Sequence, residues 1–247
     1  MNLNCVKKYF VPFILALVST MLYLLDYYLF GSARDIASSF LRNLAFLPMY
    51  VMFVTLMIER IMRERERQTI MRKLNMVIGV FFSEVGNRLL KELSAYVVMC
   101  DALSRRLLVT SQWDVDDFRV ALDYLKSHET RIDCTGCDTQ QLKDFLVSKR
   151  SFLAGLLENQ NLLEHEQFTD LLWAVFHLME ELGARQSFDS LPPSDVEHIN
   201  GDITRAFGYL SREWVFYMKH LKHDYPYLFS LAVRLNPMLE HPDPVVY

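Results

Sequence analysis

Glycine and proline are scarce in this sequence, since each occurs only eight times among 247 residues. This scarcity excludes collagen-like, elastomeric and proline-rich disordered chains. A large net charge is also missing: the formal value is −4, so the chain as a whole is not a polyelectrolyte that would bind nucleic acid. Hydrophobic residues make up 51% of the chain and aromatic residues 13%, and the length allows one or two domains with a sizeable core.

The best-marked catalytic motifs are absent as well. The sequence contains neither glycine-rich phosphate-binding pattern, GxGxxG or GxxxxGK(S/T), and it lacks the GxSxG nucleophile elbow and the kinase HRD motif. It also lacks the HExxH zinc-protease helix and the paired ExxH motifs of di-iron bundles. We therefore assign no cofactor, although an enzyme of an unmarked class stays open.

Two long apolar runs lie near the N-terminus. The first extends from Val11 to Leu25 and the second from Leu44 to Ile58, each with few polar side chains. About twenty helical residues span the roughly 30 Å of a bilayer's hydrocarbon core. With their flanks both runs reach that length, so we predict a hairpin of two transmembrane helices, over about residues 10–30 and 38–58.

Basic residues at the ends of these runs predict the orientation. Lys7 and Lys8 precede the first run, and a basic cluster follows the second, made of Arg60, Arg63, Arg65, Arg67, Arg72 and Lys73. By the positive-inside rule, both termini face the cytoplasm and the loop around residues 31–37 faces outward. We expect the basic cluster to hold the helix end against anionic headgroups of a plasma or inner membrane.

The apolar runs also leave open a cleaved signal peptide and a soluble core. Lys7 and Lys8 followed by small residues at Gly31-Ser32-Ala33 suit a signal peptide, although the apolar stretch is long and contains Asp26. In a soluble core, both runs would be buried helices. Half-exposed helices of such a core show a polar face, which these runs lack.

Asp26 and Arg42 are charged residues inside the predicted spans. Both would lie toward the outer ends of their helices, where an unpaired charge costs up to about 3 kcal/mol. Opposite charges on adjacent antiparallel helices offset each other's desolvation, so we predict an ion pair that sets the register of the hairpin. The alternative is that each side chain reaches separately to the outer headgroups.

The remainder of the chain is predicted to be all-α, because it shows no apolar–polar alternation and no Asn-Gly or Asp-Gly hairpin signal. Ten apolar positions from Leu74 to Leu107 recur every ~3.7 residues. That spacing fits a nearly straight helix that packs on its own domain better than a left-handed coiled coil, which needs about 3.5. We predict that residues 59–110 form a basic juxtamembrane segment continuing as one long amphipathic helix.

Capping signals predict a cytoplasmic bundle of helices over residues 111–236, followed by a loose tail over 237–247. The predicted helix starts are Asp114, Asp138, Asn161 and Ser194, and the corresponding ends lie near Lys126, Leu157, Gly183 and Tyr225. A short apolar helix over 227–235 comes last. With residues 1–58 as the transmembrane hairpin, this completes the predicted organisation.

Cys134-Thr135-Gly136-Cys137 is the one chemically suggestive local motif. Two thiols at this spacing can hold one edge of a metal site or form a redox pair, and His128 could supply a third ligand. A structural zinc site needs four ligands, and the sequence has no second CxxC. We therefore favour two small turn residues in a reducing cytoplasm, with the metal and redox alternatives open.

Three further pairs of side chains share a helix face: His177 with Glu181, His198 with Asp202, and His220 with His223. Such spacing invites a metal-binding interpretation. Without an accompanying ligand motif, we favour partly solvated or capping histidines.

The predicted partners are the lipid bilayer and a protein partner or a second copy of the chain. Nucleic acid is not expected, because the residues beyond 73 carry 16 basic and 25 acidic side chains. We predict an integral membrane protein with a cytoplasmic all-helical interaction or scaffold domain. The alternatives are a small oligomeric channel or transporter subunit, and a membrane-bound metal or redox enzyme or sensor that uses Cys134 and Cys137.

Overall fold

The all-helical prediction is confirmed. The computed structural model describes residues 17–28, 33–98, 100–128, 130–134, 137–159, 162 and 165–246. These residues are mostly helical and contain no β-strand, only one isolated bridge between Val97 and Ile132. The chain divides into two compact units, Met1–Arg67 and Gln68–Tyr247, which we call the N-terminal unit and the helical unit.

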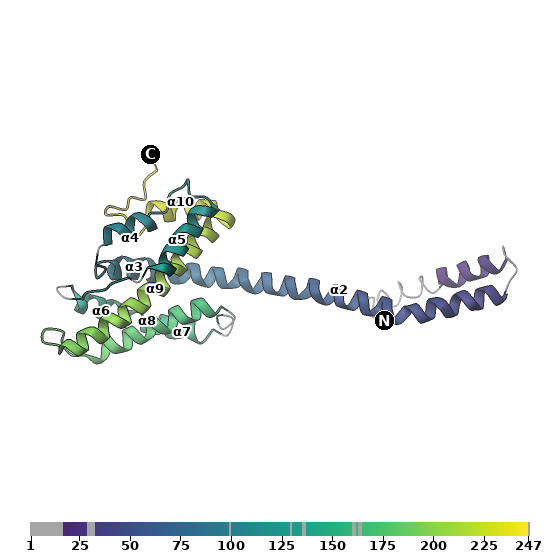
Figure 1. The fold of residues 1–247 in the computed structure, drawn as a ribbon, viewed down its shortest axis with the longest axis horizontal. Helices are drawn as coiled ribbons and strands as arrows, with labels where there is room; N and C mark the ends of the chain where they lie inside the picture. The colour runs from purple at the N-terminus through teal and green to yellow at the C-terminus, as the bar shows by residue number, and fades with distance from the viewer. Residues whose placement is uncertain are drawn as a thin grey trace, which may run out of the picture. The chain divides into compact units, whose positions relative to one another are not determined.

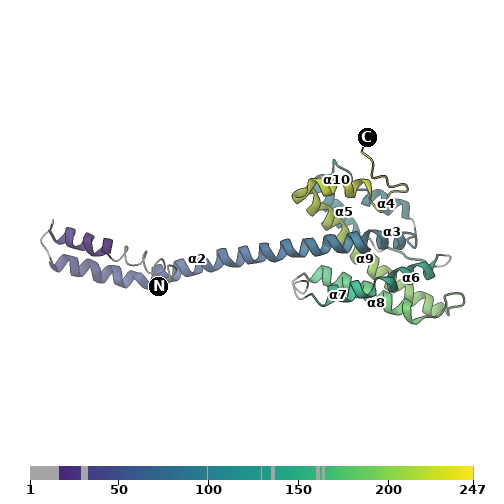
Figure 2. The same cartoon turned by 180° about the vertical axis from the view of Figure 1, so that it is seen from behind.

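The N-terminal unit contains a helix over residues 17–28 and the first part of α2 (Ala33–Phe81). These two segments lie side by side in Figures 1 and 2. The ring of Tyr23 packs edge-on against Phe40, with 6.1 Å between centroids. Residues 10–16 and 29–30 of the first predicted span, residues 31–32 of its loop, and the preceding Lys7 and Lys8 lie outside the described residues.

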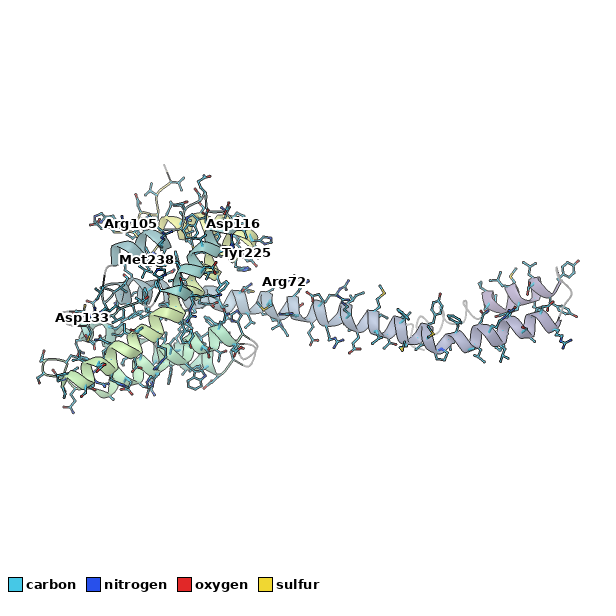
Figure 3. All side chains as sticks on the ribbon, in the orientation of Figure 1. Arg72, Arg105, Asp116, Asp133, Tyr225 and Met238 are labelled. Atoms are coloured by element: carbon cyan, nitrogen blue, oxygen red, sulfur yellow. The ribbon has the colours of Figure 1, made fainter. Side chains whose placement is uncertain are left out.

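The apolar part of α2 is exposed along its whole length. Every residue from 40 to 69 is exposed, and Figure 3 shows side chains projecting on all sides of the helix that carries Arg72. Among the described residues, one helical segment, Arg34–Ser94, is long and apolar enough to cross a membrane. The two-span hairpin stays a prediction, because the first span is described only over residues 17–28.

The helical unit follows from the end of α2 and is built around one long helix, α9 (Pro193–Asp224). Its other elements are the π-helical turn η1 (Phe82–Gly86), α3 (Asn87–Ser94), α4 (Cys100–Leu107), α5 (Val115–Ser127), α6 (Thr139–Ser148), α7 (Arg150–Leu157), α8 (Glu166–Ala184) and α10 (Pro226–Arg234). Helix α9 contacts α3, η1, α5, α8 and α10, and its contact with α8 is the most extensive (Figure 1).

Aromatic side chains anchor the end of α2 in this core. Phe81 packs edge-on against Phe168 of α8, and Phe82 stacks on Tyr217 of α9 with 4.8 Å between ring centroids. Both phenylalanines are fully buried. Removing a buried phenylalanine side chain of this kind costs about 3–5 kcal/mol of stability. The helical unit therefore depends on two aromatic residues that lie about two helical turns after the basic cluster.

The long helix predicted over residues 59–110 is wrong in its second half. Helix α3 ends at Ser94, and α4 begins at Cys100. Between them the chain pairs with a distant segment: Val98 N–H donates to the Arg131 carbonyl and Asp133 N–H donates to the Tyr96 carbonyl, both at 2.9 Å. These long-range bonds take the place of helical ones. The apolar periodicity continues across the break, since Tyr96 and Leu103 are both buried.

The structure also divides the chain differently from the prediction. The division falls after Arg67, inside the basic cluster, and the amphipathic stretch up to Leu107 belongs to the same unit as the bundle. The first residues of the predicted loose tail are held in place. Met238 packs against the core, and the preceding buried Asn236 donates to the Leu107 carbonyl at 3.3 Å.

Two of the predicted helix starts are confirmed. Asp114 caps α5, accepting from the N–H groups of Asp116 and Asp117, and the Asp117 side chain completes a capping box. Asp138 caps α6 by accepting from the Gln141 N–H at 2.9 Å. The predicted start at Asn161 lies outside the described residues. Helix α8 begins instead after His165, whose Nδ1 accepts from the Phe168 N–H.

Two predicted boundaries are wrong, and a third lies within one residue of its predicted position. The helix predicted to reach Leu157 is interrupted at Lys149. There the Ser148 hydroxyl donates to the Phe145 carbonyl at 2.6 Å, and a continuous helix would pair that carbonyl with the Lys149 N–H. Helix α8 ends at Ala184, one residue after the predicted Gly183, and the Arg185 guanidinium donates to the Glu181 carbonyl at 2.5 Å. Helix α9 starts at Pro193 rather than after a Ser194 cap, since proline's fixed φ suits the first helical position.

Gly86 is the glycine of the described chain that a methyl group would disturb most. A Cβ there would lie 2.5 Å from Phe82 Cδ1 and 2.9 Å from Phe81 Cε1, whereas at Gly79 its nearest neighbour would be Tyr217 at 3.7 Å. We predict that Gly86→Ala lowers the free energy of unfolding by about 1–3 kcal/mol. Gly79→Ala should be neutral or stabilising by up to about 1 kcal/mol.

Denaturant unfolding of the full chain in detergent, followed by circular dichroism, measures both glycine variants. Equal stability of the two would show that the aromatic cluster at η1 is not tightly packed.

Candidate functional site

The basic cluster predicted at the membrane surface is exposed. All six side chains, Arg60, Arg63, Arg65, Arg67, Arg72 and Lys73, lie at the surface. Arg63 pairs with Glu59 at 3.5 Å, one turn away on the same helix. Exposed pairs of this kind contribute at most about 1 kcal/mol, so the pair does not commit Arg63 to one partner. The headgroup-binding role of the cluster stays a prediction.

The predicted ion pair between Asp26 and Arg42 is not formed in the described structure. Arg42 is exposed and donates to the Ser39 hydroxyl at 3.1 Å, within its own helix. No ion pair joins Asp26 to another described residue. A bilayer would strengthen the attraction between these charges, and the pairing stays a prediction for the inserted chain.

Cys134 and Cys137 are free and half-buried. The Cys137 thiol lies 3.6 Å from the Ala95 carbonyl, and the Cys134 N–H donates to Asn200 Oδ1 at 3.0 Å. Burial raises the pKa of both thiols above its usual range, and the carboxylate of Asp133 adds to the effect. Their reactive thiolate forms are therefore disfavoured at neutral pH.

His128 does not join these thiols in a ligand set. Its ring stacks on Tyr124 with 4.1 Å between centroids, and its backbone ends helix α5. Within the described part of the chain, the group of three side chains placed to hold a metal ion lies elsewhere and contains no cysteine.

That group belongs to a cluster of two histidines and two carboxylates on α8 and α9, which we call the histidine–carboxylate cluster. It consists of His177 and Glu181 of α8 and His198 and Asp202 of α9. Each pair is four residues apart, so each shares a helix face. The extensive contact between α8 and α9 brings the two faces together (Figure 2).

Asp202 lies at the centre of this cluster. Its Oδ2 is 3.5 Å from His177 Nε2 and 3.4 Å from His198 Nε2. Glu181 lies at the side, with Oε1 3.9 Å from His177 Nε2 and Oε2 3.5 Å from His198 Nε2. Asp202 is only 3% exposed, whereas the two rings are 46% and 52% exposed. The carboxylate is thus buried beneath two imidazoles that face solvent.

Two arginines hold the carboxylates of the cluster in place. Arg205 donates to Asp202 Oδ1 at 3.1 Å. Arg185 donates to Glu181 Oε2 at 2.8 Å and forms a two-bond fork with Asp195 at 2.6 and 2.9 Å. Hydrogen bonding from Arg185 lowers the pKa of both Glu181 and Asp195. Glu181 and Asp195 therefore stay ionised to a lower pH than ordinary carboxyl groups.

The sequence predicted that each histidine shares a helix face with its carboxylate. It did not predict that the faces of the two helices meet. The available signal was the same His-x-x-x-carboxylate spacing on two consecutive predicted helices. Consecutive helices joined by a short loop usually pack side by side. Their rotation about their own axes, which decides whether two polar faces meet, depends on the apolar packing of the whole unit.

Comparison with known proteins identifies the family. Residues 70–234 match the family described as "Uncharacterized protein MJ1433, C-terminal helical domain", and residues 3–62 match the one described as "MJ1433, N-terminal helical domain". The chain belongs to the MJ1433 family. Protein MJ1433 of Methanocaldococcus jannaschii is 40% identical to it over 235 residues, which cover 94% of each chain. No solved structure matches the chain.

The two family descriptions name an N-terminal and a C-terminal helical domain. The histidine–carboxylate cluster and both half-buried cysteines fall in the C-terminal family domain, and the exposed apolar stretch falls in the N-terminal one.

The raised thiol pKa values predict slow cysteine chemistry. Cys134 and Cys137 should be alkylated by iodoacetamide at pH 7 more slowly than free cysteine, with the rates rising above pH 9. Peptide mapping by mass spectrometry separates them from Cys5 and Cys100. Changing both to Ser should shift the melting temperature by only a few degrees. Rapid alkylation at pH 7, or a collapse in stability, would instead indicate a redox or metal-bound pair.

A buried acid on α9 predicts a pH dependence of stability. Burial raises the pKa of Glu213 to about 7, so between pH 4.5 and 7 the folded chain holds a proton that the unfolded chain has released. The contribution of this group to the free energy of unfolding therefore falls as the pH rises through that window. Glu213→Gln should gain about 1–3 kcal/mol relative to the parent between pH 5 and pH 8. Parallel pH profiles of the two chains would contradict this assignment.

Proposed function

We propose that this chain is an integral membrane protein whose helical unit is an interaction module at the cytoplasmic surface. In this proposal the N-terminal unit crosses the bilayer as a hairpin of helices over about residues 10–30 and 38–58. The observation that carries the proposal is that every residue of the apolar run Leu44–Ile58 is exposed.

This run has no polar face. Apart from Pro48, Tyr50 and Thr55, it is made only of Ala, Val, Leu, Ile, Met and Phe. Successive residues of a helix point about 100° apart, so fifteen of them surround the helix with apolar side chains. A surface helix of a water-soluble protein would bury one face and keep the other polar. Hydrocarbon tails cover all faces at once, which is what this helix requires.

The length of the helix agrees with a membrane crossing once the residues before the run are included. Residues 38–58 span about 31 Å at 1.5 Å per residue, close to the thickness of the hydrocarbon core. Arg42 then lies within one or two turns of the outer end, from where its side chain can extend to the headgroups. The basic cluster begins at Arg60, directly after the apolar run, as the positive-inside rule requires of a cytoplasmic end.

The proposed interaction role is supported by apolar side chains that the helical unit leaves exposed. Trp173 of α8 and Tyr227 of α10 are both exposed, and such aromatic residues are frequent at the centres of protein interfaces. The proposed partner is therefore a protein or a second copy of the chain. Few polar groups occur in the second predicted span, which gives the channel alternative little support.

Two similarly exposed valines provide a matched test of membrane insertion. Val51 of α2 is 56% exposed and Val120 of α5 is 48% exposed. In water, replacing either by Asp would have similar and small effects. In a bilayer, Val51→Asp places a charge near the centre of the span, at about 3 kcal/mol on insertion scales. We predict that Val51→Asp lowers the carbonate-resistant membrane fraction, while Val120→Asp leaves it unchanged. Equal behaviour of the two variants, with the parent chain in the soluble fraction, would refute the proposal.

A further inference from the structure

We infer that the histidine–carboxylate cluster binds a divalent transition-metal ion of the zinc class. The proposed ligands are His177 Nε2 from α8 with His198 Nε2 and Asp202 Oδ2 from α9. The fourth position of a tetrahedral site is left for water or, after a side-chain movement, for Glu181, whose Oε2 lies 3.5 Å from His198 Nε2. This site is independent of the proposed membrane anchoring, because all four residues lie within the helical unit.

The spacing of the ligand atoms fits tetrahedral coordination. Zinc binds imidazole nitrogen and carboxylate oxygen at about 2.0–2.2 Å, so neighbouring ligand atoms of a tetrahedral site lie about 3.4 Å apart. The distances from Asp202 Oδ2 to His177 Nε2 and His198 Nε2 are 3.5 and 3.4 Å. The three ligand atoms all lie within 4.8 Å of one another. A metal ion could therefore be bound with only small side-chain movements.

The hydrogen-bonding state of Asp202 is an independent indication of a bound cation. Arg205 satisfies Oδ1, but Oδ2 is buried and makes no hydrogen bond to any residue that the structure describes. A buried carboxylate oxygen without a partner costs free energy. Both imidazoles come close to this oxygen, yet neither makes a hydrogen bond with it. A cation between the oxygen and the two nitrogens would satisfy all three atoms.

The surroundings favour a metal that takes nitrogen and oxygen ligands. The cluster contains no thiolate, and its histidines and carboxylates suit Zn²⁺ and neighbouring first-row ions rather than Cu⁺. Arg185 and Arg205 donate hydrogen bonds to Glu181 Oε2 and Asp202 Oδ1, which is the outer-shell support that metal ligands usually have. Because the imidazoles are about half exposed, an ion can enter from solvent. Bound there, it would link α8 to α9.

The test uses the full chain, purified in detergent without a polyhistidine tag and stripped of metal with a chelator. Isothermal titration with Zn²⁺ should show one site per chain, and Co²⁺ should give the intense visible absorption of tetrahedral coordination. His177→Ala and His198→Ala should each weaken Zn²⁺ binding at least about 100-fold. Their rings are half exposed, so both variants should fold, which circular dichroism verifies.

His223→Ala is the matched control, because His223 lies on α9 beside a different carboxylate, Asp224, at 2.7 Å. This variant should bind Zn²⁺ like the parent chain. Zinc should also raise the melting temperature of the parent chain and of His223→Ala, but not that of the two cluster variants. The inference is overturned if the parent chain binds no zinc. It is equally overturned if all three histidine variants lose affinity to the same extent.

Discussion

A helix with no polar face is the constraint on which the rest of the structure depends. The run Leu44–Ile58 exposes about a dozen large apolar side chains. At about 1.5–3 kcal/mol for each fully exposed side chain, leaving them half exposed to water would cost on the order of 10 kcal/mol. That is comparable to the whole stability of a typical domain. In the membrane arrangement that we propose, lipid removes this cost, and the bilayer then determines where the chain is anchored.

The helical unit follows a different principle, since its helices bury one face each. Helix α9 is the exception: several neighbours pack on it, and it places buried residues from Ile199 to Leu221 around most of its circumference. Asp202 and Glu213 are therefore buried. Asp202 lies beneath two histidines, and Glu213 has no charged partner in the part of the chain that the structure describes. Because α9 is covered on several sides, some of its polar side chains lie in the core. There Asp202 Oδ2 lacks a hydrogen bond to the described residues, and burial raises the pKa of Glu213.

Local signals in the sequence predicted much of this fold, but long-range contacts set its breaks. The all-helical class, the cap at Asp114 and the cap at Asp138 follow from periodicity and from side chains within three residues of each helix start. The end of α3 does not, because it depends on hydrogen bonds from residues 96–98 to a segment some 35 residues later. The histidine–carboxylate cluster shows the same limit. Each half is visible in the sequence, and the approach of α8 to α9 is not.

The most direct test of membrane anchoring is the labelling of single cysteines in intact cells with a membrane-impermeant maleimide. The full chain, with its four native cysteines changed to Ser, carries either Arg34→Cys in the predicted outer loop or Val115→Cys on the exposed start of α5. Membrane anchoring predicts that the first reacts from outside and that the second reacts only after the membrane is permeabilised. It is contradicted if both positions behave alike, or if the cysteine at position 34 is protected while that at 115 is labelled.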